Sequence, residues 1–177
     1  MWHVIQTLGG KEEETADMIR KMVSSYSMEE CFVPKRERMK KFRGSWNKVE
    51  EVLFHGYVFV VSKRPEELYQ ELKQIPRLTK VLGREDQYFF SLSEEDKRFV
   101  REIGNEDYKT AISQIELVEG RQIRVIKGPL KGFVGDVVKV NLHKKEAAIK
   151  VGFMGREMEL FLGIEMIKDG SDSLQKS

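Results

Sequence analysis

The sequence predicts an α+β protein, in which an N-terminal antiparallel-sheet α/β sandwich is joined by a linker to a small C-terminal β-barrel. In the first half, strand-like and helix-like hydrophobic patterns follow one another in the order β-α-β-β-α-β-α. In the second half, residues 121–151 form a strand–turn–strand pattern of β-branched residues with Gly and Pro at the breaks. The predicted boundaries are 1–104 for the first domain, 105–116 for the linker, 117–170 for the barrel and 171–177 for a tail.

The first elements follow from local patterns. Residues 2–8 are a short apolar segment that two glycines end, which indicates a strand. Apolar residues at helical spacing, with acids early and bases late, predict a helix over 11–24. Residues 31–34 indicate a strand ended by proline, and the basic stretch 35–48 indicates an exposed loop or hairpin.

The most apolar run, residues 53–62, predicts a buried strand by its length and its β-branched and aromatic content. Pro65 suits the first turn of a second helix. Residues 78–82 predict another short strand, and Ser93, with acids directly after it, predicts the N-cap of a third helix. The acidic, weakly periodic stretch that follows is the predicted linker.

Composition permits one large domain or two small ones in 177 residues. The formal net charge is only +2, but the charges are segregated along the chain. Residues 35–48 hold seven basic residues and one acid, residues 121–151 hold eight and two, and residues 85–120 hold four basic residues and ten acids. This asymmetry predicts separate faces for separate partners.

The sequence carries no pattern of an enzyme or a metal site. The three histidines lie in different segments, and no phosphate-binding loop or nucleophile elbow is present. The single cysteine, Cys31, excludes an internal disulfide framework and is most simply a small buried hydrophobe. No apolar run approaches the roughly 18 residues of a membrane span, and no secretory signal is recognisable. We expect a cytoplasmic, monomeric protein without catalysis, cofactor, metal or membrane association.

Four stretches, in order, resemble the NusG family of transcription elongation factors. The opening of the family's N-terminal domain, termed NGN, is similar to WHVIQTLGGKEEETADMI, and its Leu-Phe-Pro-Gly-Tyr-Val-Phe-Val strand is similar to LFHGYVFV. The KOW motif resembles RVIKGPLKGFVGDVVKV, and the family's C-terminal end resembles VGFMGREMELFLGIEMI. The resemblance covers nearly the whole chain, and it implies an NGN-like sandwich followed by an SH3-like KOW barrel.

Three features depart from the family's usual pattern. His55 stands where the family usually has Pro, no Pro follows Gly83, and the basic stretch from Lys35 to Lys48 is unusually rich. These departures favour a specialised paralogue over the general elongation factor. The LoaP group of antitermination factors is the group that the chain resembles.

The resemblance implies that the first domain binds RNA polymerase across its cleft, at the clamp, and so promotes elongation past terminators. Strand alternation places Phe54 on one face of the 53–62 run and His55, Tyr57 and Phe59 on the other. Spacing alone favours core packing for these aromatics, whereas the resemblance favours a contact with polymerase. The predicted polymerase-binding residues are Phe54, His55, Tyr57 and Phe59.

One of two basic segments is predicted to bind a structured RNA hairpin, the KOW unit being the first candidate and the basic stretch over 35–48 the second. Lysines attract phosphate without regard to sequence, whereas Arg can read base edges in a loop, bulge or widened groove. Trp46, among the bases, is interpreted as a loop anchor rather than a stacking residue. The candidates are Arg121, Arg124, Lys127, Lys131, His143, Lys144 and Lys145 in the KOW unit, and Lys35, Arg36, Arg38, Lys40, Lys41 and Arg43 in the basic stretch.

Other partners remain open at this point. The resemblance also implies that the KOW barrel recruits the ribosome or a termination factor. The alternative interpretation is a ribosome-associated RNA-binding protein with a KOW barrel, which would not need the apolar strand or the acidic linker of the first half.

Overall fold

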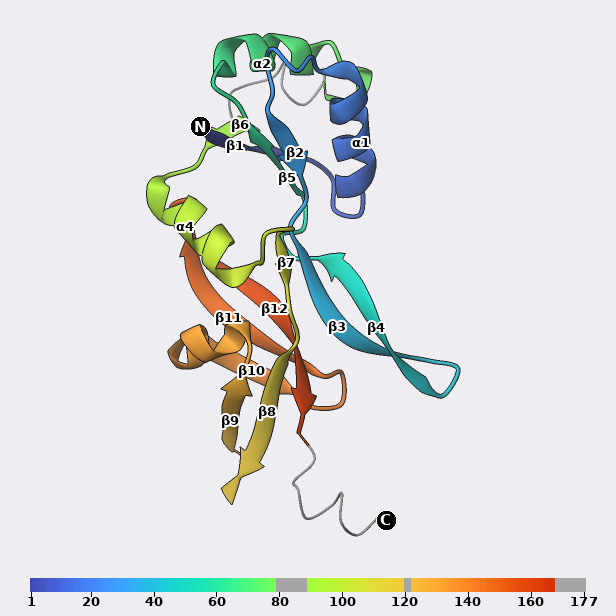
Figure 1. Cartoon of the computed structure of the whole chain (residues 1–177), viewed down its shortest axis with the longest axis vertical. Helices are drawn as coiled ribbons and strands as arrows, with labels where there is room; N and C mark the ends of the chain where they lie inside the picture. The colour runs from blue at the N-terminus through green and yellow to red at the C-terminus, as the bar shows by residue number, and fades with distance from the viewer. Residues whose placement is uncertain (79–88, 120–121, 168–177) are drawn as a thin grey trace. The chain divides into compact units, whose positions relative to one another are not determined.

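The computed structural model describes residues 1–78, 89–119 and 122–167. The chain divides into two compact units. Unit 1 comprises Met1–Pro34 and Phe54–Arg101, and unit 2 comprises Lys35–Leu53 and Glu102–Ser177. The predicted α+β class is confirmed, since unit 1 combines a sheet with helices and unit 2 is built mainly from strands (Figure 1). Three predictions concern positions outside the described residues, namely most of the strand over 78–82, the base Arg121 and the tail over 171–177.

A four-stranded antiparallel sheet with the order β2-β5-β1-β6 forms the centre of unit 1. In its register, Phe59 of β5 lies opposite Val4 of β1 on one side and Phe32 of β2 on the other. Because β1 and β5 are central strands buried on both faces, their sequences are nearly continuous runs of apolar residues. The strands are β1 (Trp2–Gln6), β2 (Glu30–Phe32), β5 (Tyr57–Val61) and β6 (Phe89–Ser91).

Three helices of unit 1 begin where the sequence predicts them. In α1 (Glu12–Met22) the first turn is acidic and the last turn basic, which suits the helix dipole. Pro65 begins α2 (Pro65–Lys73), where its missing N–H is no loss. The Ser93 hydroxyl accepts the backbone N–H of Asp96 at 3.1 Å, at the start of α4 (Glu94–Ile103).

Helices cover both faces of this sheet. On one face the Cys31 thiol donates to the Ala16 carbonyl of α1 at 3.9 Å, and burial raises the pKa of this thiol to about 12. On the other face Phe99 of α4 meets Phe54, with ring centroids 6.5 Å apart, and Phe54 in turn meets Phe59 at 5.3 Å. Figure 1 shows α1 and α4 on opposite sides of the sheet. Cys31 is therefore a buried hydrophobe, as predicted.

The predicted strand over 53–62 is shorter than expected. β5 begins only at Tyr57, because residues 53–56 form a bend and a turn in which Gly56 adopts a φ of +84°. The Gly56 carbonyl accepts the Thr7 N–H at 2.7 Å, and the Gly56 N–H donates to the Glu12 carboxylate at 2.7 Å. These bonds fix the turn next to the start of α1.

Unit 2 contains two sheets, with the strand orders β4-β3-β7 and β10-β11-β12-β8-β9. Its core includes Ile115, Leu130, Ile149, Phe153 and Leu162. A 3₁₀-helical segment, Pro129–Asp136, follows β9, so the strand break predicted at Gly128 and Pro129 is confirmed. The strands are β3 (Lys35–Phe42), β4 (Ser45–Val52), β7 (Lys109–Thr110), β8 (Ser113–Val118), β9 (Gln122–Lys127), β10 (Val137–Asn141), β11 (Glu146–Phe153) and β12 (Arg156–Met166).

The segment over 105–116, expected to be a linker, contains regular structure. β7 and the beginning of β8 lie within it, and β8 pairs with both β9 and β12. The period-2 burial of Ser113 and Ile115 explains the strand, since both side chains are fully buried among neighbouring strands. The domain boundaries proposed from the sequence remain a prediction.

Candidate nucleic-acid interface

The basic stretch folds as a β-hairpin of two eight-residue strands, β3 and β4, one of the two forms expected for it. The register runs from Lys35 opposite Val52 to Phe42 opposite Ser45. Arg43 and Gly44 form the turn with φ values of +50° and +80°, and two positive φ values are what a type I′ hairpin turn requires. Residues 40–48 form the exposed end, which holds four bases and no acid.

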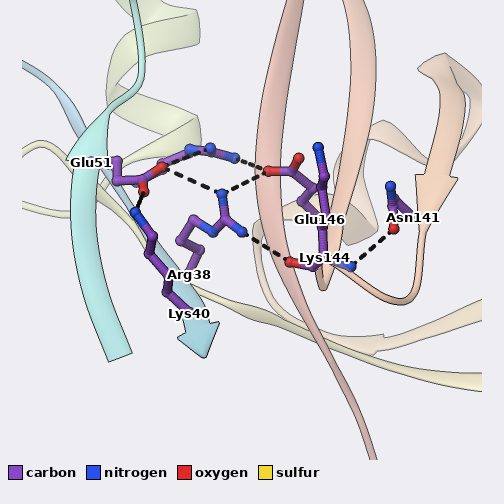
Figure 2. Close-up of polar contacts among 7 residues, drawn as sticks. Arg38, Lys40, Glu51, Asn141, Lys144 and Glu146 are labelled. Atoms are coloured by element: carbon purple, nitrogen blue, oxygen red, sulfur yellow. Dashed lines mark hydrogen bonds and ion pairs between the residues drawn. The ribbon is translucent and has the colours of Figure 1, made fainter. Parts of the chain in front are cut away.

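Two arginines at the base of the hairpin are held by carboxylates. Arg36 is only 6% exposed; its Nη2 donates to Oε2 of Glu51 at 2.9 Å, and its Nη1 donates to Oε2 of Glu146 at 3.0 Å. Arg38 Nη1 lies 3.6 Å from the same Glu51 oxygen and 3.3 Å from the same Glu146 oxygen (Figure 2). Two guanidinium groups thus share two carboxylates, as buried charges require. This cluster fixes the hairpin to β11, and it engages two of the predicted RNA-binding residues.

A second set of contacts joins the hairpin to the β10–β11 turn, residues 141–145. Arg38 Nη2 donates to the Lys144 carbonyl at 3.1 Å, and the Lys144 N–H donates to Oδ1 of Asn141 at 2.9 Å (Figure 2). The Lys145 ammonium lies 4.2 Å from the centre of the Trp46 ring. The interpretation of Trp46 as an anchor of its own loop stays a prediction, since this contact is to a residue outside the hairpin. The two basic segments of the sequence therefore meet in unit 2.

The remaining predicted bases differ in surroundings. Lys40 is exposed and 3.9 Å from Glu51, and Arg43 stacks its guanidinium 5.2 Å from the centre of the Phe42 ring. Arg124 on β9 is exposed and paired with Glu116 at 3.0 Å. Lys35 is half-buried at the base of the hairpin. The other candidates among the described residues are exposed or half-exposed, namely Lys41, Lys127, Lys131, His143, Lys144 and Lys145.

The strand order separates these bases into two groups. β9, with Arg124 and Lys127, lies at one end of the five-stranded order, and the β10–β11 turn lies at the other. The structure brings the hairpin bases together with residues 143–145. Sequence reasoning missed Glu51 and Glu146, the two carboxylates that hold this arrangement. A signal existed for Glu146, which is one of only two acids among the many bases of residues 121–151.

The expected aromatic face for polymerase is not open. Phe54, Tyr57 and Phe59 are 1%, 5% and 0% exposed, and His55 alone of the four predicted residues is exposed. The alternation that placed Phe54 on the face opposite Phe59 was wrong, because residues 53–56 lie outside the strand: Phe54 packs on Phe59, and Phe99 of α4 packs on Phe54. The assignment of these residues to polymerase contact remains a prediction.

In unit 1, the turn that presents His55 is tied to a buried carboxylate. Glu12 is 2% exposed and accepts the N–H groups of Gly10 at 3.1 Å and Gly56 at 2.7 Å. Burial by itself raises the pKa of the Glu12 carboxyl, but these N–H groups outweigh it and bring the pKa below its ordinary value.

The described residues contain neither a group of three His, Cys, Asp or Glu side chains able to hold a metal ion nor a helix long and apolar enough to cross a membrane.

Comparisons with known proteins agree in both halves of the chain. Residues 1–101 match the family described as transcription termination factor nusG, and residues 119–151 match the KOW motif. The transcription termination/antitermination protein NusG of Buchnera aphidicola is 26% identical over 175 residues, which cover 94% of each chain. The protein of the same name from Thermus thermophilus is 24% identical over 180 residues, covering 94% of this chain and 96% of the other.

A solved structure gives the same fold. The structure described as "Domain interaction in Thermotoga maritima NusG" has a TM-score of 0.52 and 23% identity, over 92% of each chain. The family match covers more than half of this sequence and is followed, in the expected order, by the KOW match. The chain therefore belongs to the NusG family, with a NusG N-terminal domain followed by a KOW motif.

Proposed function

We propose that this protein is a transcription elongation and antitermination factor that binds RNA polymerase through its N-terminal domain and is recruited by a structured RNA. The observation that carries the proposal is the ordered match of both family segments. The relatives aligned over 94% of the chain are named transcription termination/antitermination proteins, which supports the same class of action here. The many basic residues of the hairpin, and His55 in place of the family's usual Pro, favour a specialised, LoaP-like role.

For the polymerase contact, His55 is the member of the predicted set that remains available. Its side chain is exposed in the turn before β5, while Phe54 and Tyr57 on either side are buried and support the turn. We place the contact at this turn and assign the buried aromatics the task of holding it. Exposed groups set in a rigid turn are well suited to a binding site.

Co-purification tests the proposal most directly. Tagged full-length protein should retain RNA polymerase from a cell extract, and added protein should increase readthrough of an intrinsic terminator in a purified transcription assay. His55→Glu should weaken both effects, because it adds a charge at the contact. Gln70→Glu, an exposed position on α2 with the same change of charge, is the matched control and should leave both effects unchanged.

The alternative function makes the opposite prediction. Retention of ribosomes without RNA polymerase, and no change in readthrough, would support a ribosome-associated KOW protein and reject the elongation factor.

A further inference from the structure

We propose that the hairpin end, residues 40–48, and the β10–β11 turn, residues 141–145, form one binding site for unpaired nucleotides. In this site a nucleobase stacks on Phe42. The flanking phosphates meet Lys40, Lys144 and the basic side chains beside them. The inference deepens the proposed function, because it names the part of the nucleic acid that the basic segments recognise. We call this site the hairpin–turn surface.

The hairpin and the β10–β11 turn contact each other and form one surface. Arg38 joins them directly, since its guanidinium donates to the Lys144 carbonyl at 3.1 Å. Arg38 and Arg36 also meet Glu146, the residue directly after the turn, at 3.3 Å and 3.0 Å. Lys145 adds the contact over Trp46. A ligand that reaches the basic side chains of the hairpin would therefore also reach the basic side chains of the turn.

The pairing register of the hairpin shows which side chains share a face. Residues 36, 38, 40 and 42 alternate onto one face of β3. Arg36 and Arg38 on this face contact Glu146 and the turn. Lys40 and Phe42 therefore continue, toward the exposed end, the same face that adjoins Lys144. Trp46, opposite Lys41 in the register, belongs to the other face and is engaged by Lys145.

Phe42 is an exposed aromatic side chain beside a cation. It is 65% exposed at the tip of a hairpin whose turn is fixed by two positive φ values, and the Arg43 guanidinium lies 5.2 Å from its ring centre. An apolar ring this exposed contributes little to folding. An exposed ring beside a cation suits a nucleobase, because the ring can stack on the nucleobase and the cation can meet an adjoining phosphate.

An exposed aromatic ring favours unpaired nucleotides over a duplex. Bases of a regular duplex are stacked on one another, and A-form RNA hides its major-groove edges from side chains. An exposed aromatic ring gains a partner only where a base is free, as in a loop, a bulge or a single strand. Glu51 and Glu146, two acids beside this surface, are occupied by Arg36 and Arg38, and Glu37 lies 3.6 Å from Lys48. These pairs leave Lys41, Lys144 and their neighbours to attract phosphate.

The experiment measures binding of the full chain to labelled probes by fluorescence anisotropy at fixed salt. The probes are an oligouridylate and an oligothymidylate of about twelve nucleotides, a length within the range that single-strand sites cover, and a blunt RNA duplex of the same length. Phe42→Ala should weaken binding of the single strands roughly ten-fold and leave the duplex nearly unchanged. Phe42→Trp should restore it. A preference between the two single strands identifies RNA or DNA as the natural source.

The matched control is Tyr26→Ala. Tyr26 is 63% exposed and carries Arg64 4.0 Å from its ring centre, but it lies in unit 1, away from both basic segments in sequence. Equal losses for Phe42→Ala and Tyr26→Ala, or equal losses for single strand and duplex, would overturn the site.

A second arm separates this inference from the proposed function. Phe42→Ala should still co-purify with RNA polymerase. If Phe42→Ala instead weakened polymerase retention and left strand binding intact, Phe42 would contact protein, and the hairpin–turn surface would be rejected. If the unaltered protein failed to retain polymerase but bound single strands through Phe42, the proposed function would be rejected and the hairpin–turn surface would be supported.

Discussion

β5 and the β3–β4 hairpin are both aromatic-containing strands to which the sequence assigned binding, and they differ in how many faces are covered. β5 is central in its sheet, with α1 on one face and α4 on the other, so Phe59 is fully buried. The hairpin is held at its base by Glu146 and nearer its end by the contact of Lys145 with Trp46, and Phe42 remains exposed at its tip. An aromatic residue in a continuous apolar run therefore packs in the core, whereas an aromatic residue among basic residues at a hairpin end is available to a ligand.

The largest expected effect is on stability and separates the two regions directly. Phe59→Ala should lower the free energy of unfolding by about 3–5 kcal/mol, because it opens a cavity between Phe32 and Phe54. Phe42→Ala should change it by no more than about 0.5 kcal/mol, as exposed positions do. Urea denaturation followed by circular dichroism measures both. Similar losses for the two variants would mean that the contrast between β5 and the hairpin is false.

A second prediction tests what holds the hairpin base. Glu146→Ala should cost about 3 kcal/mol, because the buried Arg36 loses one of its two carboxylates and Glu51 alone must serve two guanidinium groups. Glu157→Ala is the control on the neighbouring strand, since Glu157 is exposed and 3.8 Å from Lys150. It should cost less than about 1 kcal/mol. Denaturation of the two variants side by side gives the answer, and equal midpoints would refute a stabilising cluster.

A third prediction concerns Glu12, which fixes the turn that carries His55. Glu12→Ala should cost about 2 kcal/mol, because the N–H groups of Gly10 and Gly56 lose their acceptor. The pKa of Glu12 is lowered in the folded protein, so the unfolded chain binds the proton more tightly. Its stabilising contribution is therefore present above the ordinary carboxyl pKa and is lost as the pH falls through the folded value.

Urea midpoints at neutral and acidic pH measure this contribution. The difference in stability between the unaltered protein and Glu12→Gln should shrink as the pH falls. A difference that stayed constant with pH would exclude the charge of Glu12 as its cause.

Much of the fold was predictable because its signals are local. The acids and bases of α1, Pro65 at the start of α2 and the glycine and proline after β9 each specify an element without help from distant residues. The family resemblance supplied the order of the two domains. The strand start at Tyr57 was missed because Gly56 bonds to Glu12, a residue far away in the sequence.

The candidate site was predictable only in part, for the same reason. Charge segregation found both basic segments, but it could not show that Arg36 and Arg38 are neutralised by Glu51 and Glu146. Alternation along β5 predicted two faces, yet it could not reveal that α4 would cover the second one. Pairings between distant residues depend on tertiary packing, which a local pattern does not record.

The smallest expected effects compare the two basic groups of unit 2. Arg124 and Glu116 are 3.0 Å apart but largely exposed, so Arg124→Ala should change the free energy of unfolding by less than about 1 kcal/mol. Lys144→Ala should be equally mild for folding, because the contacts described for Lys144 use its backbone.

RNA binding should separate Lys144→Ala from Arg124→Ala. If the hairpin–turn surface carries the phosphate contacts, Lys144→Ala should reduce the slope of log affinity against log salt by about one, whereas Arg124→Ala should leave it unchanged. Titrations of an RNA hairpin at several salt concentrations measure both slopes. A reduced slope for Arg124→Ala with an unchanged slope for Lys144→Ala would move the RNA-binding surface to β9, at the other end of the strand order.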